Sequence, residues 1–260
     1  MAHPIAPSAD PPVHPPAAPR RKILVEVLLA YAASCAVAAA LYRLPGLDGW
    51  FHVVVAALFL YLPMWLLRSR DLDPYGYRAS PIAWNLLFAL VVALIVFPPF
   101  LIGWAAFQKL ACALPPLRAL ASTPCRPGGL WNFGGHFALR LPPDLLRPSL
   151  AHNLALAELV VVALPEEFFF RGYVQGRLDE VWAPSRRFFG ARIGPSLPIG
   201  AALFALCHVA VQGNLGTLAV FFPGLLFGWM RARSGSILPG IVFHAACNLY
   251  IDTLTRSFLG

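Results

Sequence analysis

The sequence predicts an all-α fold, a polytopic transmembrane helical bundle of about seven to eight spans. Of its 260 residues, 58% are hydrophobic and only 12% are charged, whereas soluble domains average about 25% charged residues. The hydrophobic residues form runs long enough to cross the hydrocarbon layer of a bilayer as helices. Most Lys and Arg residues lie between these runs, as topology determinants do. The net charge of +8 therefore indicates contact with anionic lipid. Nucleic acid is not an expected partner, because no basic tract is interleaved with aromatic residues.

Three parts follow from the composition along the chain. Residues 1–22 are predicted to be a disordered, Pro- and Ala-rich cytoplasmic tail, because they lack an apolar pattern. Residues 23–149 hold the N-terminal spans and a long loop, and residues 150–260 form a C-terminal helical core. No cleaved signal peptide is expected, because the basic residues 20–22 lead straight into an apolar run too long for one.

Seven apolar runs are predicted as spans, and they cover residues 23–44, 50–67, 82–107, 154–171, 194–211, 215–230 and 237–254. Pro98 and Pro99 predict a kink or break in the third run. An eighth span could lie in the long connection 108–149. Charged and apolar residues alternate over 177–192, which predicts an interfacial amphipathic helix and loop.

The distribution of basic residues predicts the orientation of the bundle. With the N-terminus in the cytoplasm, most Lys and Arg residues fall on the cytoplasmic side, as the positive-inside rule requires. The many Ala, Pro and Arg residues indicate a GC-rich bacterial genome. We therefore expect a multi-pass protein of the bacterial inner membrane.

The five cysteines show no CxxC spacing, which argues against a zinc ribbon or a thioredoxin-like motif. Cys112 and Cys125 lie in the long connection and could form a disulfide if it faces an oxidising compartment, although nothing in the sequence fixes their geometry. The other three cysteines lie within apolar runs, where a small buried side chain is expected.

Two adjacent glutamates and an arginine end the fourth apolar run. Each ionisable group at bilayer depth costs about 2.5–3.5 kcal/mol on insertion scales, so such groups indicate a functional site. Glu167 and Arg171 are at i,i+4 with the acid first, the favourable order for an ion pair. Glu166 is left without a local partner. Glu158, earlier in the same run, is interpreted as a lumen-facing or pore-lining polar residue.

Further polar side chains lie on two later runs. His208 follows Phe204 by one helical turn, and Asn248 follows His244 by one turn, so each pair shares a helix face. A carboxylate and an imidazole can together hold and deprotonate a water molecule. A second imidazole and an amide can direct donors at a developing oxyanion. These groups together make the minimal set for amide hydrolysis.

Several other interpretations stay open. His208 and Asn248 could each be no more than an interhelical hydrogen-bond partner. The chain has no HExxH motif, no GxSxG nucleophile elbow and no pair of intramembrane Asp residues. Zinc ligation by Glu166, His208 and His244 with one water is chemically possible. A non-catalytic membrane scaffold or immunity-type protein could use the same fold, and a transporter would also use intramembrane Glu and His, although no inverted repeat is visible.

The three motifs Glu166-Glu167-x-x-x-Arg171, Phe204-x-x-x-His208 and His244-x-x-x-Asn248 resemble those of the CAAX protease and bacteriocin-processing (CPBP) family, the Rce1-like or ABI group. The likeness covers about residues 150–250, and it makes residues 150–260 a catalytic core. It implies a metal-free intramembrane glutamic endopeptidase with no cofactor.

The same resemblance assigns a role to each residue. Glu166 would be the general base, with His208 orienting or activating the water. His244 and Asn248 would form the oxyanion hole, and Glu167, Arg171 and Phe204 would support the site. The expected substrates are membrane proteins or lipoproteins with a C-terminal processing signal, as in myxosortase-like bacterial branches.

Overall fold

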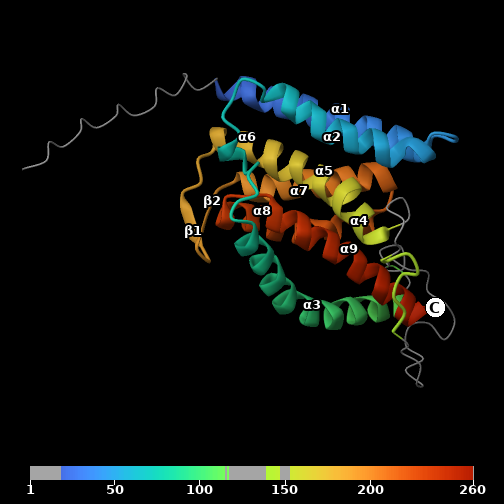
Figure 1. Ribbon diagram of the computed structural model, residues 1–260. Helices are drawn as coiled ribbons and strands as arrows, with labels where there is room; N and C mark the ends of the chain where they lie inside the picture. The colour runs from blue at the N-terminus through green and yellow to red at the C-terminus, as the bar shows by residue number, and fades with distance from the viewer. Residues whose placement is uncertain (1–18, 115, 117–138, 147–152, 260) are drawn as a thin grey trace, which may run out of the picture.

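The computed structural model describes residues 19–114, 116, 139–146 and 153–259 of the chain (Figure 1). Its helical segments are α1 (Arg20–Arg43), η1 (Asp48–Trp50), α2 (Phe51–Leu66), η2 (Asp73–Tyr75), α3 (Ile82–Ala113), α4 (Leu154–Ala157), η5 (Glu158–Ala163), α5 (Leu164–Glu167), η6 (Phe168–Gln175), α6 (Gly176–Val181), α7 (Ser196–Gln212), η7 (Leu215–Val220), α8 (Phe221–Ser234) and α9 (Leu238–Leu259). Segments η5 and η6 are π-helical, whereas η1, η2 and η7 are 3₁₀ turns. Each of the seven predicted spans coincides with helical structure.

The number of spans is not confirmed. Among the described residues, three helical segments are long and apolar enough to cross a membrane by length and composition, namely Arg20–Arg43, Ile82–Leu110 and Leu215–Ser234. Two shorter apolar helices cover Phe51–Leu66 and Ser196–Gln212. An eighth span would fall largely in residues 117–138, which lie outside the described residues.

The helices are arranged in layers around the segment that carries the two glutamates. Helices α1 and α2 lie side by side along one edge of the bundle, and the continuous helical run from α4 to α6 lies beneath them (Figure 1). Helix α7 packs against α1 and α8, and α9 follows below (Figure 1). Helix α3 packs on the outer side of α9. The glutamate segment is therefore enclosed by the rest of the bundle.

The buried core explains this central position. Residues Phe169, Phe170 and Tyr173 are at most 2% exposed, and they belong to one hydrophobic cluster with side chains of α1, α2, α7, α8 and α9. Phe59 of α2 stacks on Phe169, with ring centroids 4.7 Å apart. Phe204 of α7 meets Phe170 edge to face at 5.0 Å. Aromatic contacts thus fix the glutamate segment from two sides.

The predicted kink in the third span is present. Helix α3 continues through Pro98 and Pro99 without a break, and it is visibly bent (Figure 1). Proline removes one backbone donor and crowds the preceding turn, which is the usual cause of such a bend.

The predicted interfacial helix and loop over 177–192 is helical as far as Val181, but a β-hairpin stands where the loop was expected. The chain instead forms an antiparallel hairpin of β1 (Arg186–Phe188) and β2 (Ala191–Ile193), the two strands found among the described residues. Its two-residue turn has positive φ at both positions, 42° at Phe189 and 76° at Gly190. Both φ values have the sign that a type I′ hairpin turn requires.

Two of the cysteines that were expected to be no more than small buried side chains are bonded to each other. Cys35 of α1 and Cys207 of α7 form a disulfide with their Cα atoms 5.6 Å apart. Cys247 is free. The hypothesis that Cys112 pairs with Cys125 lies outside the described residues.

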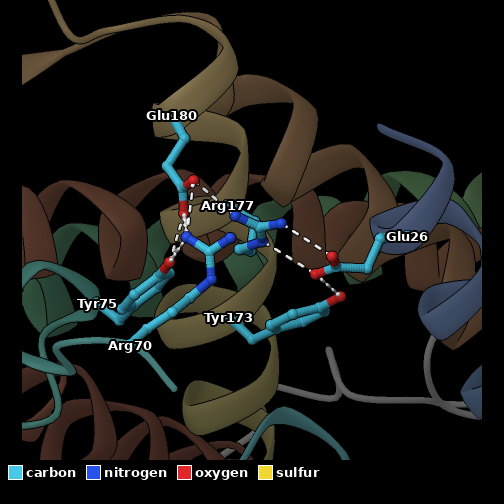
Figure 2. A network of polar contacts seen from close by, with 6 residues as sticks. All are labelled: Glu26, Arg70, Tyr75, Tyr173, Arg177 and Glu180. Atoms are coloured by element: carbon cyan, nitrogen blue, oxygen red, sulfur yellow. Dashed lines mark hydrogen bonds and ion pairs between the residues drawn. The ribbon is translucent and has the colours of Figure 1, made fainter. Parts of the chain in front are cut away.

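A network of charged side chains joins α1 to α6 and to the α2–α3 connection (Figure 2). Arg177, only 1% exposed, places Nη2 2.9 Å from Glu26 Oε2 and Nη1 2.6 Å from Glu180 Oε2. Glu180 also accepts hydrogen bonds from Arg70 and from the Tyr75 hydroxyl. Two carboxylates thus compensate the buried guanidinium, and three segments distant in sequence are held together.

Candidate active site

The helical run that carries the glutamates is irregular on both sides of them. Helix α5 holds Pro165, Glu166 and Glu167, and it lies between the π-helical segments η5 and η6. Proline has no N–H to continue an α-helical ladder. π-helical turns inside α-helices are rare and occur frequently at functional sites. The local sequence therefore leads to a non-standard backbone at the predicted site.

The predicted ion pair between Glu167 and Arg171 is present and fully buried. Arg171 Nη1 lies 3.1 Å from Glu167 Oε1, and the two side chains are 3% and 0% exposed. The guanidinium also lies over the rings of Phe204 and Phe227, at 4.1 and 5.0 Å from their centroids. Its Nη2 approaches the Gly224 carbonyl oxygen at 3.4 Å. Opposite charge and aromatic faces together compensate the loss of water around Arg171.

His244 lies between the two glutamates. Its Nδ1 is 3.0 Å from Glu167 Oε1, and its Nε2 is 3.7 Å from Glu166 Oε2. The ring stacks on Phe227, with centroids 4.8 Å apart and planes inclined by 17°. Because an ionised carboxylate only accepts hydrogen bonds, Nδ1 carries the proton in this contact. Glu167 thereby fixes the imidazole so that Nε2 faces Glu166.

Glu166 differs from its neighbour in exposure and in partners. Its side chain is 20% exposed, whereas that of Glu167 is fully buried. Its Oε2, like that of Glu167, accepts no hydrogen bond from the described part of the chain. Glu166 also lacks contacts as close as those of Glu167 Oε1 with Arg171 and His244. A carboxylate oxygen that is buried and unpartnered beside an imidazole can share a proton with it. This geometry suits an acid–base group more than a structural one.

His208 joins the site through Phe204. Its Nδ1 lies 3.0 Å from the Phe204 carbonyl oxygen. Because a carbonyl only accepts, Nδ1 is protonated in this bond, and a neutral ring then has a free lone pair on Nε2. The Phe204 ring is 4.5 Å from the His208 ring and 6.0 Å from the His244 ring. The two imidazoles thus border the same aromatic side chain. Within the described residues, His208 forms no hydrogen bond with Glu166.

Asn248 is hydrogen-bonded to Glu158, a residue that the sequence did not place at the site. Its Nδ2 donates to Glu158 Oε2 at 2.8 Å. Glu158 was interpreted as a lumen-facing or pore-lining residue, whereas the structure directs it at a predicted site residue. One signal was available, because Glu158 is a third acid in the same apolar run and carries the same cost of burial.

Two glycines also contribute to the site, although the sequence did not indicate them. A Cβ atom at Gly240 of α9 would lie 3.0 Å from Glu167 Oε2, and one at Gly224 of α8 would lie 3.3 Å from Arg171 Nη2. Gly224 and Gly228 are four residues apart on α8, the spacing of small residues that lets membrane helices approach closely. That spacing was the available signal.

The structure therefore brings Glu166, Glu167, Arg171, Phe204 and His244 into direct contact. His208 reaches this cluster through Phe204, and Asn248 lies one turn after His244 on α9. The side chains come from α5, η6, α7 and α9, so the three motifs of the sequence meet at one place in the fold.

The apolar helices of the described chain indicate an integral membrane protein. Residues 148–250 match the family model described as "Type II CAAX prenyl endopeptidase Rce1-like". This region of the chain is thus similar to Rce1-like CAAX proteases, and the match includes all seven predicted site residues. The resemblance that the sequence motifs indicated is confirmed for residues 148–250. No curated protein and no solved structure matches the chain.

Proposed function

We propose that the protein is an intramembrane glutamic endopeptidase that cuts its substrates near their C-terminus. The observation that carries this proposal is the position of His244, hydrogen-bonded to Glu167 and facing the unpartnered oxygen of Glu166. Glu167 is held by Arg171 and His244, whereas Glu166 is available for proton transfer. Two titratable carboxyl groups in such different environments suit different roles.

Glu166 acts as the general base in this mechanism. It takes a proton from a water molecule that the Nε2 lone pair of His208 helps to hold, and the water oxygen bonds to the carbonyl carbon of the substrate. The proton then passes from Glu166 to the leaving amine nitrogen as the C–N bond breaks. The carboxylate is thereby regenerated.

His244 and Asn248 stabilise the oxyanion of the tetrahedral intermediate. An imidazole that carries a proton on both nitrogens can donate Nδ1–H to Glu167 Oε1 and present Nε2–H to the oxyanion on its other side. The amide of Asn248 supplies a second N–H donor. Preorganised donors of this kind contribute about 10²–10³ in kcat each.

The substrates are membrane proteins or lipoproteins with a C-terminal processing signal, and the matched family suggests a prenylated cysteine next to the cut. The enzyme works within a lipid bilayer, which we propose to be the bacterial inner membrane with the N-terminus in the cytoplasm. Nucleic acid has no part in the reaction.

The reaction proceeds without a metal ion. The chain has no HExxH motif, and the described residues contain no group of three or more His, Cys, Asp or Glu side chains placed to hold a metal ion together. A chelator should therefore leave the rate unchanged. Loss of activity that added zinc restores would contradict this part of the proposal.

The replacement Glu166→Gln tests the assignment directly. We expect a fall in cleavage of about 10²–10⁴-fold, the contribution of a general base, with insertion and folding preserved. A fluorogenic peptide with an S-farnesyl cysteine and a C-terminal tripeptide serves as the probe for the purified protein. C-terminal peptide sequencing of membranes from cells with either form identifies natural substrates, which should accumulate uncleaved with Glu166→Gln.

Asp252→Asn is the matched control, since Asp252 also changes from acid to amide but pairs only with the exposed Arg256 among the described residues. It should cleave at the normal rate. Full cleavage activity of Glu166→Gln would refute Glu166 as the general base, and absence of cleavage by the unmodified protein would favour a non-catalytic scaffold.

A further inference from the structure

Glu158 forms the one polar contact that fixes the amide of Asn248 in the described part of the chain. The Asn248 Nδ2 to Glu158 Oε2 distance is 2.8 Å, and both side chains are partly buried. Hydrogen bonds to an ionised carboxylate are roughly twice as strong as neutral ones. Asn248 is no free amide, and its orientation is set by an acid from a different helical segment.

The π-helical segment η5 explains how Glu158 reaches this position. Glu158 precedes Glu166 by eight residues, which on a regular α-helix would turn the two side chains about 80° apart. Segment η5 runs from Glu158 to Ala163, and its i→i+5 turns contain more residues each. The wider turns reduce the angle, so both carboxylates face α9. Glu166 there meets His244, and Glu158 meets Asn248.

An asparagine side chain can present either of two faces to a substrate. Rotation by 180° exchanges Oδ1 and Nδ2, and only Nδ2 carries the hydrogen atoms that an oxyanion needs. An ionised carboxylate accepts but does not donate, so Glu158 selects the rotamer in which Nδ2 points toward it. The amide nitrogen has two hydrogen atoms, and the second stays available for the substrate.

We propose that Glu158 is a positioning residue that holds Asn248 in the one orientation able to donate to the oxyanion. This inference rests on the proposed function, because it needs Asn248 to act on the substrate. It adds a residue that lies in none of the three sequence motifs. Glu158 itself does not touch the reacting atoms.

Two replacements at Glu158 separate its effect on the orientation of Asn248 from the effect of its size. Glu158→Leu removes the acceptor at similar size and should lower kcat by at least about tenfold with KM nearly unchanged, because misplaced donors stabilise the transition state poorly. Glu158→Gln can accept through its own oxygen or donate through its nitrogen. It therefore permits both orientations of Asn248 and should lose only about twofold.

A double-mutant cycle with Asn248→Ala gives the decisive readout. If Glu158 acts through Asn248, Glu158→Leu should have no further effect on kcat once Asn248 is absent. A general structural effect would instead multiply with that of Asn248→Ala. An equal loss in both backgrounds would overturn the proposal, and so would a change in KM alone.

A third variant covers the case in which Glu158→Leu does not fold. The exchange Glu158→Gln with Asn248→Asp keeps a hydrogen bond between the two positions but leaves no N–H for the oxyanion. It should fold as the unmodified protein does and be about as inactive as Asn248→Ala. Normal activity of the exchange would show that the bond alone matters, which would refute the positioning role.

The same measurements separate this inference from the proposed function. If Glu166→Gln or Asn248→Ala cleaves the farnesylated probe normally, the catalytic assignment fails and the role of Glu158 fails with it. If both are impaired while Glu158→Leu is unaffected, the catalytic assignment stands and only the positioning role is refuted.

Discussion

A single buried carboxylate contacts both a guanidinium and an imidazole at this site. Glu167 Oε1 is 3.1 Å from Arg171 Nη1 and 3.0 Å from His244 Nδ1. A carboxylate without water is stable only when opposite charge and hydrogen bonds replace the solvent. Glu167 therefore connects the glutamate motif to α9. Its neighbour Glu166 has no comparable partner among the described residues, and this contrast leads to opposite expectations for two adjacent acids.

Glu167→Gln should destabilise the protein, whereas Glu166→Gln should not. Removing one partner of a buried ion pair costs about 3–5 kcal/mol, because the other charge stays buried without compensation. Thermal unfolding of the two variants in the same detergent measures the difference. Equal unfolding temperatures would mean that the ion pair does not hold the site together.

Tyr75 gives a second expectation at this scale, outside the spans. Burial of the phenol and its hydrogen bond to Glu180 raise the pKa of Tyr75 to about 12, from an ordinary value of 10.0. The folded state thus favours the neutral phenol. The resulting contribution to stability is complete below pH 10 and is lost as the pH rises from 10 to about 12.

Tyr75→Phe removes this titration, so its unfolding temperature should fall less between pH 10 and 12 than that of the unmodified protein. Absorbance of the phenolate, followed by difference between the two forms, gives the midpoint directly. A midpoint near 10 would contradict the burial of this phenol.

At the scale of helices, small residues make room for the charged cluster. The side of α9 that faces Glu167 carries Gly240, and the side of α8 that faces Arg171 carries Gly224. A larger side chain at Gly240 would collide with Glu167, and one at Gly224 would collide with Arg171. The close approach of α8 and α9 to the glutamate segment is thus a condition for the ion pair.

Gly240→Ala should lower the unfolding temperature and the cleavage rate together, because the new Cβ would lie 3.0 Å from Glu167 Oε2. Gly103→Ala on α3 is the control, since a Cβ there meets nothing within 4 Å. Alanine is favoured over glycine within a helix by about 1 kcal/mol, so the control should be unchanged or slightly more stable. A similar response of both variants would contradict the proposed crowding at Gly240.

Hydropathy and i,i+4 spacing were sufficient to predict the apolar helices and the Glu167–Arg171 pair. The hairpin was not predicted, because alternating Arg and apolar residues fit either a helix or a strand, and its turn uses Phe189-Gly190 instead of the common Asn-Gly. The π-helical turns were also missed, since periodicity assumes a constant number of residues per turn. For that reason the contact of Glu158 with Asn248 could not be predicted from the sequence.

In the whole molecule, described segments from before and after residue 150 pack into the same hydrophobic core. One hydrophobic cluster contains Ile23 and Phe59 from the first half and Phe169, Phe204 and Phe243 from the second. The predicted division into N-terminal spans (23–149) and a catalytic core (150–260) stays a prediction. Long-range packing of this kind has no local signature, so it could not be inferred from the chain.

A fragment of residues 150–260 should therefore fail to fold on its own, although it contains every proposed catalytic residue. It would expose the aromatic surface that α1 and α2 cover, and its buried Arg177 would lose Glu26. Co-expression with residues 1–149 should restore a folded complex. Protease resistance in detergent measures both results, and a resistant, active fragment would refute the expectation.

The disulfide between α1 and α7 can form only late in the synthesis of the chain. Its cysteines are 172 residues apart, and a ribosome that adds about 5–20 residues per second needs roughly 9–34 s to make that stretch. Throughout this interval Cys35 is a free thiol in a helix whose partner does not yet exist. A thiol-blocking reagent should thus prevent the bond when it is present during synthesis, and it should have no effect once the bond has formed.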